Sequence, residues 1–369
     1  MILTGKKKLM RLQSILKEST SKGREYNHLE DLVFFEGSSG AFKAAQLLTR
    51  LGQDTGDVSI KWDGSPTIFW GRQPNGTFVL VGKNGWGKRM STTPEDLSDY
   101  ILNTGKGEDW RKEFAAGMSS LFAIMEDSTP ADMRGYVYGD LLFHPGKPAV
   151  KNKDSITFKP NNVTYTVDSQ SPLGQKMSKS SVCVVVHTWH DAFGDKVGTP
   201  IKAPKKLNSE LVTVLGQTYV TQTPAIDTSA VENIVNTTRN NSTKIDNWLA
   251  PEQGLSRKDQ ILYTYVNQMT KMGKLDQIRS GFFDWLKQSK VSPGQQTKLM
   301  SNDSQGLDII LDLVAQIQTA KNNIIDQLDA TSTDVKAVTG NKPGGEGYVV
   351  TRDKIKLVPR DRWTPVQVG

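Results

Sequence analysis

Lys61 is the first residue of chemical interest, because it interrupts an apolar, strand-like stretch. The surrounding sequence is VSIKWDGSPTIFWG (58–71), and Asp63 and Gly64 supply a turn signal directly after the lysine. A lysine amine is a nucleophile only when unprotonated, and its ordinary pKa is about 10.4. Burial and neighbouring cations lower that pKa, which makes Lys61 a candidate nucleophile. The alternative is structural: Lys61 extends its ammonium group to solvent or pairs with a carboxylate at a sheet edge.

A second group of charged residues lies near the other end of the sequence. Glu346 follows two glycines and precedes an apolar stretch in GGEGYVV, and DKIKL places Lys354 and Lys356 two residues apart. Side chains alternate along a strand, so we expect both lysines on one face. Such a pair could hold a phosphate if it faces a site, or merely protect a sheet edge if it faces solvent.

Asp140 is the third candidate, because it is a carboxylate within the apolar stretch RGYVYGDLLF. Burying a carboxylate without a partner is costly, so such a residue usually binds a cation, a lysine or a ligand hydroxyl group.

Short strands and turns are predicted around these candidates. Residues 57–83 read as three strands broken by Gly, Pro and Asn-Gly turns, with QPNG as a strong hairpin signal. Further strands are expected in RGYVYGDLLF, either as one strand with a turn or as a pair, and in SITFKPNNVTYTVD and SVCVVVHTWHDAF. Residues 5–20, 39–51 and 95–126 have helical spacing instead.

The composition changes near Pro200. Residues 204–335 have helical periodicity and many Asn, Gln, Asp and Lys residues, and strand character returns at GGEGYVVTRDKIKLVPR. We therefore predict an α+β protein with an antiparallel, β-rich core that a helical insertion interrupts. The expected parts are an N-terminal helical segment (1–56), the first part of the core (57–200), the helical insertion (201–338) and the C-terminal strands of the core (339–369).

Composition limits the class of protein. The mean hydropathy is −0.46, and the absence of any run of about 18 apolar residues predicts no membrane partner. The single cysteine, Cys183, lies in a β-branched run and is expected to be a buried side chain rather than a nucleophile. This cysteine usage fits the cytoplasm, or the host cytoplasm if a phage encodes the protein. The net charge of +7 favours an anionic partner such as nucleic acid or a nucleotide.

In this order, the motifs resemble those of the covalent nucleotidyltransferase superfamily, which includes the ATP-dependent polynucleotide ligases and the capping enzymes. They are KWDG at 61–64 (motif I, KxDG), VGKNG at 81–85 (the motif that follows), YGDLL at 138–142 (motif III), VVVHTWHDAF at 184–193 (motif IIIa), EGYVV at 346–350 (motif IV) and KIKL at 354–357 (motif V). The combination is most similar to the bacteriophage-type RNA ligases.

This resemblance covers residues 57–195 and 343–358, and it implies an ATP-grasp-like ligase core. The implied activity is nucleotidyl transfer through a lysyl-AMP at Lys61, with ATP and Mg²⁺ (or Mn²⁺) as cofactors. The implied acceptor is nucleic acid with 5′-phosphate and 3′-hydroxyl ends, with RNA as the expected type. The sequence does not indicate an oligomeric state.

The resemblance also assigns roles to individual residues. Lys61 would attack the α-phosphorus of ATP while Lys354 and Lys356 neutralise phosphate charge. Glu346 would hold Mg²⁺, and Asp140 would contact the ribose or a second metal ion. The remaining candidates are Asp63 and Gly64 for the motif I turn, Lys83 for a phosphate or ribose oxygen, and Trp189, or alternatively His187, for stacking on adenine.

Two departures separate the sequence from the family pattern. Asp140 stands where motif III usually has glutamate, which alters the reach of the carboxylate, and the helical insertion separates motifs IIIa and IV. Only residues 357–369 follow Lys356, so the OB-fold domain that follows motif V in DNA ligases and capping enzymes is not expected. The insertion would cover the active site or bind nucleic acid. Alternatively, it would mediate oligomerisation or bind another protein.

Three rival interpretations stay open on the sequence alone, and the simplest is an ordinary basic α+β domain whose motif matches arise by chance. The protein could be an adenylyltransferase that uses Lys61 for another acceptor, which a nick-sealing assay would separate from a ligase. It could also be a non-enzymatic binding protein with a decayed nucleotidyltransferase core, such as a component of a phage particle. The intact charged residues of motifs I, IV and V argue against this last interpretation.

Overall fold

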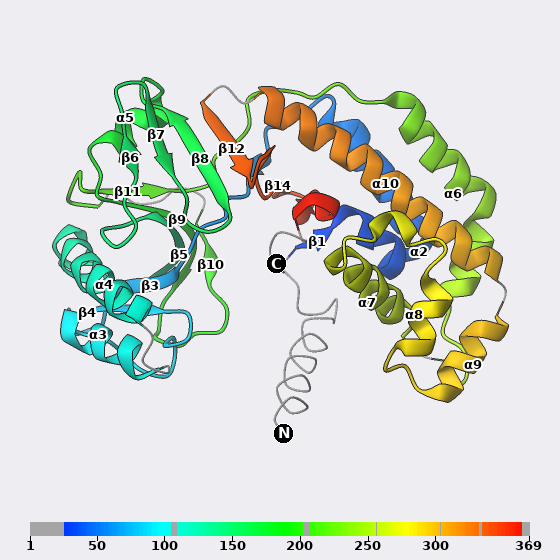
Figure 1. Cartoon of the computed structure of the whole chain (residues 1–369), viewed down its shortest axis with the longest axis horizontal. Helices are drawn as coiled ribbons and strands as arrows, with labels where there is room; N and C mark the ends of the chain where they lie inside the picture. The colour runs from blue at the N-terminus through cyan, green and yellow to red at the C-terminus, as the bar shows by residue number, and fades with distance from the viewer. Residues whose placement is uncertain are drawn as a thin grey trace. The chain divides into compact units, whose positions relative to one another are not determined.

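The computed structural model describes residues 26–104, 109–201, 207–255, 257–302, 304–331 and 334–363. Within these residues helices and largely antiparallel sheets combine into an α+β structure, as the sequence predicts (Figure 1). The helix predicted at 5–20 lies outside the described residues.

The chain divides into two compact units, each assembled from distant segments. The helical unit contains the described residues within 1–59, 220–330 and 347–369, and the sheet unit contains those within 60–219 and 331–346. Both ends of the described chain therefore join most of the predicted insertion in one unit.

This division differs from the predicted boundaries at 57–200, 201–338 and 339–369. Strands β11 (Val212–Leu215) and β12 (Val335–Thr339) fall inside the predicted helical insertion but belong to the sheet unit. Each is short and gains its partner from a distant segment, β9 for β11 and β8 for β12, so local sequence periodicity carries little sign of either.

The helical unit contains the helices that the periodicity predicts, together with a small sheet. Within the described residues the helices are α2 (Leu32–Leu51), α6 (Thr228–Leu249), α7 (Lys258–Lys271), α8 (Phe282–Gln288), α9 (Pro293–Ser301) and α10 (Ser304–Thr331), with 3-10 turns η2 (Leu29–Asp31) and η3 (Leu275–Gln277). The sheet has the order β1-β15-β14-β2, with β1 at Asn27–His28, β2 at Val58–Ile60, β14 at Tyr348–Val350 and β15 at Ile355–Leu357. None of the helices in the described ranges has both the length and the apolarity needed to cross a membrane.

Four charged side chains are buried together in the helical unit. Lys321 of α10 donates to both carboxylate oxygens of Glu30, at 2.9 and 2.8 Å. Arg360 donates to Glu30 at 3.3 Å and to Asp31 at 2.9 Å. All four residues are at most 2% exposed, so each charge depends on the others for compensation.

This buried network predicts a loss of stability in acid. Burial acts to raise the pKa of Glu30, but Lys321, Arg360 and His28 outweigh burial and lower it to about 2, against an ordinary 4.5. Because the folded-state pKa lies below the unfolded one, the stabilisation is complete above pH 4.5 and is lost as pH falls towards 2. We expect the free energy of unfolding to fall by roughly 3 kcal/mol across that window. Urea denaturation at several pH values measures this, and an equal fall in Glu30→Gln would contradict it.

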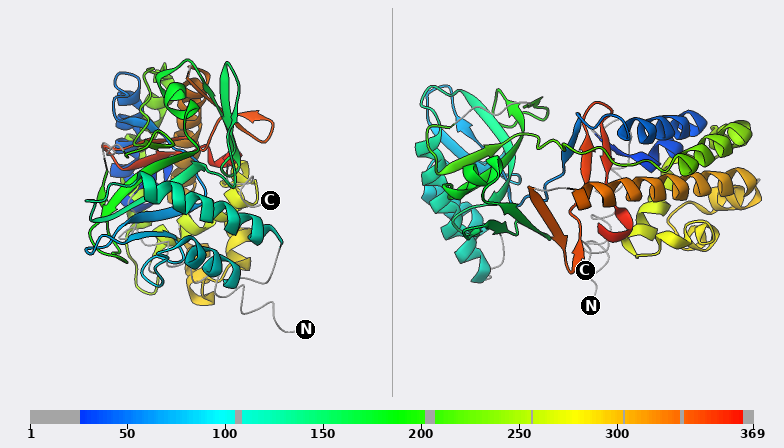
Figure 2. Two further views of the ribbon diagram at one scale, coloured as in Figure 1. Left: turned by 90° about the vertical axis from the view of Figure 1, so that its left-hand side faces the viewer. Right: turned by 90° about the horizontal axis from the view of Figure 1, so that it is seen from above.

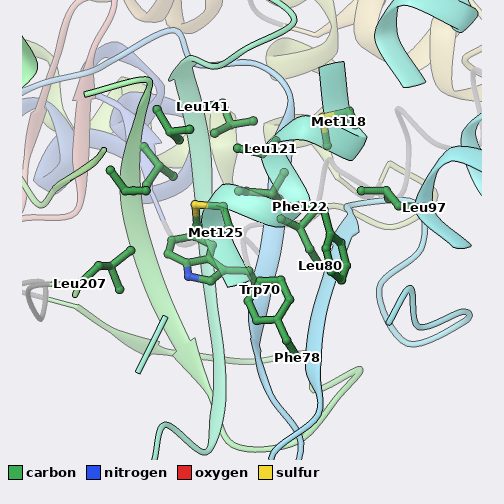
Figure 3. Packing of buried hydrophobic residues seen from close by; sticks show 14 of the residues in the cluster. Trp70, Phe78, Leu80, Leu97, Met118, Leu121, Phe122, Met125, Leu141 and Leu207 are labelled. Carbon is green, nitrogen blue, oxygen red and sulfur yellow. The ribbon is translucent and has the colours of Figure 1, made fainter. Parts of the chain in front are cut away.

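The first sheet of the sheet unit carries helices on one face. Its order is β10-β9-β5-β3-β4 with β11 beside β9, and the strands are β3 (Thr67–Arg72), β4 (Phe78–Gly82), β5 (Gly135–Phe143), β9 (Val182–His190) and β10 (Thr199–Pro200). Helices α3 (Pro94–Asn103) and α4 (Asp109–Ser128) pack against it (Figure 2). Figure 3 shows Trp70 and Phe78 of the sheet meeting Phe122 and Met125 of α4 in this core. Cys183 is fully buried in β9, as predicted, and burial raises the pKa of its thiol.

The second sheet of the sheet unit has the order β13-β12-β8-β7-β6. It contains β7 (Ser155–Phe158) and β8 (Val163–Asp168), which form a hairpin within the stretch where strands were expected, together with β6 (Val150–Lys151) and β13 (Lys342–Pro343), and α5 (Pro172–Ser178) follows β8. The stretch RGYVYGDLLF forms one continuous strand, β5, so neither expected alternative, a pair of strands or a strand with a turn, is correct.

Candidate active site

The face of the first sheet opposite α3 and α4 carries polar and aromatic side chains. Thr67 of β3 pairs with Asp140 of β5, and Phe69 pairs with Tyr138. Residues directly opposite each other in a sheet share a face, and alternate residues along a strand do too, so these four lie together. The neighbouring Trp70 points to the helix-covered core instead.

Lys61 follows β2 directly, and its ammonium group forms an ion pair with the carboxylate of Glu346. Their side chains are only 25% and 14% exposed. The structure thus brings together the lysine of motif I and the glutamate of motif IV. An ion pair also fits the structural alternative for Lys61, so its other neighbours decide between the two interpretations.

Glu346 is positioned by the second sheet. The preceding Gly344 donates its N–H to the carbonyl oxygen of Ala337 in β12 at 2.9 Å, and its own carbonyl oxygen accepts the hydroxyl of Thr339 at 2.8 Å. Ala337 pairs with Tyr165 of β8. The segment that carries Glu346 is therefore anchored beside Tyr165.

The motif I loop is fastened to the same sheet through Asp63. Its N–H donates to the hydroxyl of Tyr165 at 2.8 Å, and its carboxylate accepts the side-chain amide of Asn161 at 3.0 Å. The carboxylate also accepts the backbone N–H groups of Asn162 and Val163, at 2.9 and 3.3 Å. Asp63 is buried, and these contacts give it a structural role: it orients the loop.

Gly64 allows this loop to pack directly on β5. A Cβ atom at Gly64 would lie 2.6 Å from the Cβ of Asp140, closer than two carbon atoms can approach. The next residue, Ser65, donates its N–H to the carbonyl oxygen of Leu141 at 2.8 Å. Because Gly64 has no side chain, Lys61 comes near enough for its charge to act on Asp140.

Both oxygens of the Asp140 carboxylate accept hydrogen bonds within the protein. The Thr67 hydroxyl donates to Oδ1 at 2.6 Å, and Nε2 of His187 lies 2.9 Å from Oδ2. Burial acts to raise the pKa of Asp140, but His187, Thr67 and the charge of Lys61 outweigh it and hold that pKa below its ordinary value. Asp140 is therefore ionised at neutral pH.

His187 shares the face of Asp140 by strand alternation. Val185 pairs with Asp140, and His187 lies two residues farther along β9. A β-bulge follows at once, because Tyr138 pairs with Thr188 while Gly139 pairs with Val186, which leaves His187 as the extra residue of β9. Bulges are common beside active sites. From the sequence, His187 was expected only as an alternative for stacking on adenine.

Trp189, the first choice for stacking on adenine, lies on the other face of the sheet. It pairs with Val137, which packs against the helix-covered core. Tyr138 is an aromatic side chain that does share the face of Asp140, and its ring centroid is 5.4 Å from that of His187. Strand alternation could have identified it, because Tyr138 precedes Asp140 by two residues.

Lys83 lies at the same end of the first sheet as Thr67. It directly follows Gly82, the last residue of β4, and Gly82 pairs with Ile68 of β3. Its side chain is exposed.

Lys354 and Lys356 belong to the helical unit. Lys354 ends a turn with a left-handed backbone (φ 54°), and only Lys356 lies in β15, where it pairs with Val349. The expectation that strand alternation places both lysines on one face is therefore wrong. The turn after β14 extends through Lys354, and the sequence DKIKL does not reveal where the turn stops.

The carboxylates around Lys61 suit a magnesium ion, which needs few protein ligands, better than a metal ion that is enclosed by protein ligands alone. In the described ranges, no three His, Cys, Asp or Glu side chains gather as a metal-binding group. Mg²⁺ usually takes one or two carboxylates and keeps several waters or substrate phosphates. Glu346 suits this role, whereas the two oxygens of Asp140 already accept hydrogen bonds from Thr67 and His187.

Comparison with known proteins identifies a family without an assigned activity. No curated protein and no solved structure matches the chain. The sequence model of one family, described as a family of unknown function (DUF6267), matches residues 25–364. Because this match spans more than half of the chain, the protein belongs to the DUF6267 family.

Proposed function

We propose that the protein is an ATP-dependent nucleotidyltransferase that is adenylylated at Lys61 and joins polynucleotide ends, with RNA as the expected substrate. The observation that carries this proposal is the convergence of Lys61, Asp140 and Glu346 from three distant segments. They come from the three stretches that resemble motifs I, III and IV. Motifs matched by chance would have no physical reason to meet.

The first step would form a bond between the unprotonated Nζ of Lys61 and the α-phosphorus of ATP. The bond from the α-phosphorus to the oxygen that bridges it to the β-phosphorus breaks, and pyrophosphate leaves with that electron pair and one proton from Nζ. A 5′-phosphate oxygen of the acceptor then displaces Lys61, which regains its proton. Finally, a 3′-hydroxyl oxygen attacks the 5′-phosphorus, loses its proton and releases AMP.

The residues of the sheet unit have distinct parts in this proposal. Asp63 and Gly64 fix the loop so that Lys61 is held in one place. Glu346 would hold Mg²⁺, which when bound neutralises phosphate charge. Tyr138 offers an aromatic face beside Asp140. The phosphate-neutralising part that the resemblance gives to Lys354 and Lys356 remains a proposal.

Intact-mass measurement tests the proposal. We expect the wild-type protein, incubated with ATP, MgCl₂ and inorganic pyrophosphatase, to gain the mass of one AMP, and peptide mapping to place the adduct on Lys61. An adduct with GTP alone would redirect the proposal to capping-like chemistry. No adduct, in protein that is also free of AMP as purified, would favour the non-enzymatic binding protein.

Strand joining tests the second half of the proposal. Two nicked duplexes are compared, each with a 5′-phosphate and a 3′-hydroxyl at the nick: one has RNA strands at the nick and the other has DNA strands. We expect the protein to seal the duplex with RNA strands. An adduct without sealing of either duplex would leave an adenylyltransferase with another acceptor.

A further inference from the structure

Asp140 is poorly placed to contact a ligand itself. Its oxygens accept from Thr67 and His187, and Gly64 packs against its Cβ atom. The Asp140 side chain is 21% exposed, and that of His187 is 40% exposed. Of these two side chains, His187 is therefore the one that a bound molecule would meet more readily.

The contact with Asp140 determines which nitrogen of His187 can accept a hydrogen bond. An ionised carboxylate can only accept, so Nε2 of His187 must carry the proton in this hydrogen bond. In the neutral ring, Nδ1 then has a lone pair and no hydrogen. No described residue is hydrogen-bonded to Nδ1, so it is available to accept from a ligand donor.

A hydroxyl group of the ligand is the donor that suits this acceptor. Phosphate oxygens at neutral pH only accept, so they do not complement Nδ1. In a nucleotide whose α-phosphate lies at Lys61, the sugar is the next group along the molecule, and the base lies farther away. The charge of Lys61 acts on Asp140, the residue that holds His187, so the imidazole is one side chain away from the reacting amine.

We propose that His187, oriented by Asp140, recognises a sugar hydroxyl group and makes the protein select ribonucleotides over deoxynucleotides. This inference rests on the proposed function. It also gives a reason for the aspartate in motif III: a carboxylate one methylene shorter than glutamate leaves space for the imidazole of His187, whose Nε2 lies 2.9 Å from it. His187 then makes the ligand contact, and Asp140 acts as a positioning residue.

Equilibrium binding to Lys61→Arg, which cannot form the adduct, isolates recognition from reaction. We expect one of the two analogues, 2′-deoxyATP or 3′-deoxyATP, to bind roughly tenfold more weakly than ATP, because the analogue that lacks the recognised hydroxyl leaves Nδ1 without a donor. In a Lys61→Arg/His187→Ala double variant, ATP and that analogue should bind equally. His187→Gln, whose amide oxygen can accept, should retain part of the difference. Asp191→Asn, at the exposed end of β9, is the matched control and should retain all of it.

The ratio of the two affinities separates this role from a purely structural one. Damage to the fold would weaken ATP and the deoxy analogue equally, whereas loss of the proposed contact changes their ratio. Asp140→Asn tests the orienting role: its amide can donate to Nε2, which moves the ring proton to Nδ1 and removes the acceptor. We expect that variant to lose the preference for the ribonucleotide.

The outcomes distinguish this inference from the proposed function. If ATP does not bind at all, both are overturned. Suppose that ATP binds but the protein shows no preference for the ribonucleotide, or that the preference persists in His187→Ala. Either result overturns the role of His187 and leaves the proposed function standing. If the protein instead discriminates ATP from purine riboside triphosphate, and His187→Ala abolishes only that difference, His187 reads the adenine amino group and the sugar assignment is wrong.

Discussion

Replacing Lys61 with arginine is expected to abolish adduct formation without unfolding the protein. Arginine keeps the positive charge and can still pair with Glu346, so the ion pair of this partly buried carboxylate is preserved. The guanidinium group stays protonated at neutral pH and offers no free amine for attack on phosphorus. Removing a covalent nucleophile typically costs about 10⁴-fold or more in rate, so the adduct should fall below detection by intact mass and by transfer of label from α-labelled ATP.

Lys112→Ala is the matched control for this result. Lys112 is 75% exposed on α4, the helix that covers the opposite face of the first sheet, so the variant should form the adduct as the wild type does. Both variants should unfold at the wild-type midpoint in thermal denaturation. Adduct formation by Lys61→Arg at the wild-type rate would show that another residue is the attachment point.

Much of the sheet unit could be predicted because its signals are local. QPNG does lie in the connection between β3 and β4, and the alternation in SITFKPNNVTYTVD does give the β7–β8 hairpin. The apolar spacing of α10 likewise marks its buried face. Strands β11 and β12 were missed because partners distant in sequence stabilise them. The boundaries of the two units were missed for the same reason, because each unit is assembled from segments that are distant in sequence.

The candidate site was predicted only in part, for a related reason. The order of the motifs suggested that Lys61 and Glu346 meet, and they do. Alternation along β9 cannot be counted through its bulge, so the sequence did not reveal that Trp189 faces away from Asp140, whereas alternation from Val185 does place His187 beside it. A single extra residue in one strand thus decides which side chains reach the site.

Lys321→Met is expected to destabilise the helical unit severely. The change removes the ammonium group that contacts both oxygens of Glu30, which leaves a buried carboxylate dependent on Arg360 alone. Breaking one partner of a buried ion pair costs about 3–5 kcal/mol, a large part of the stability of an ordinary domain. Urea denaturation followed by circular dichroism, which reports the helices of this unit, measures the loss.

A double variant shows whether the loss comes from the uncompensated charge or from packing. Glu30→Gln combined with Lys321→Met removes both charges of the pair, so it should recover part of the stability that Lys321→Met alone loses. Lys287→Met is the control for removing a lysine from an ion pair, because Lys287 pairs with Asp284 on the exposed surface of α8 and should change stability by less than about 1 kcal/mol. If Lys321→Met cost no more than this control, the buried network would contribute little, and apolar packing between α10 and the rest of the helical unit would have to account for its stability.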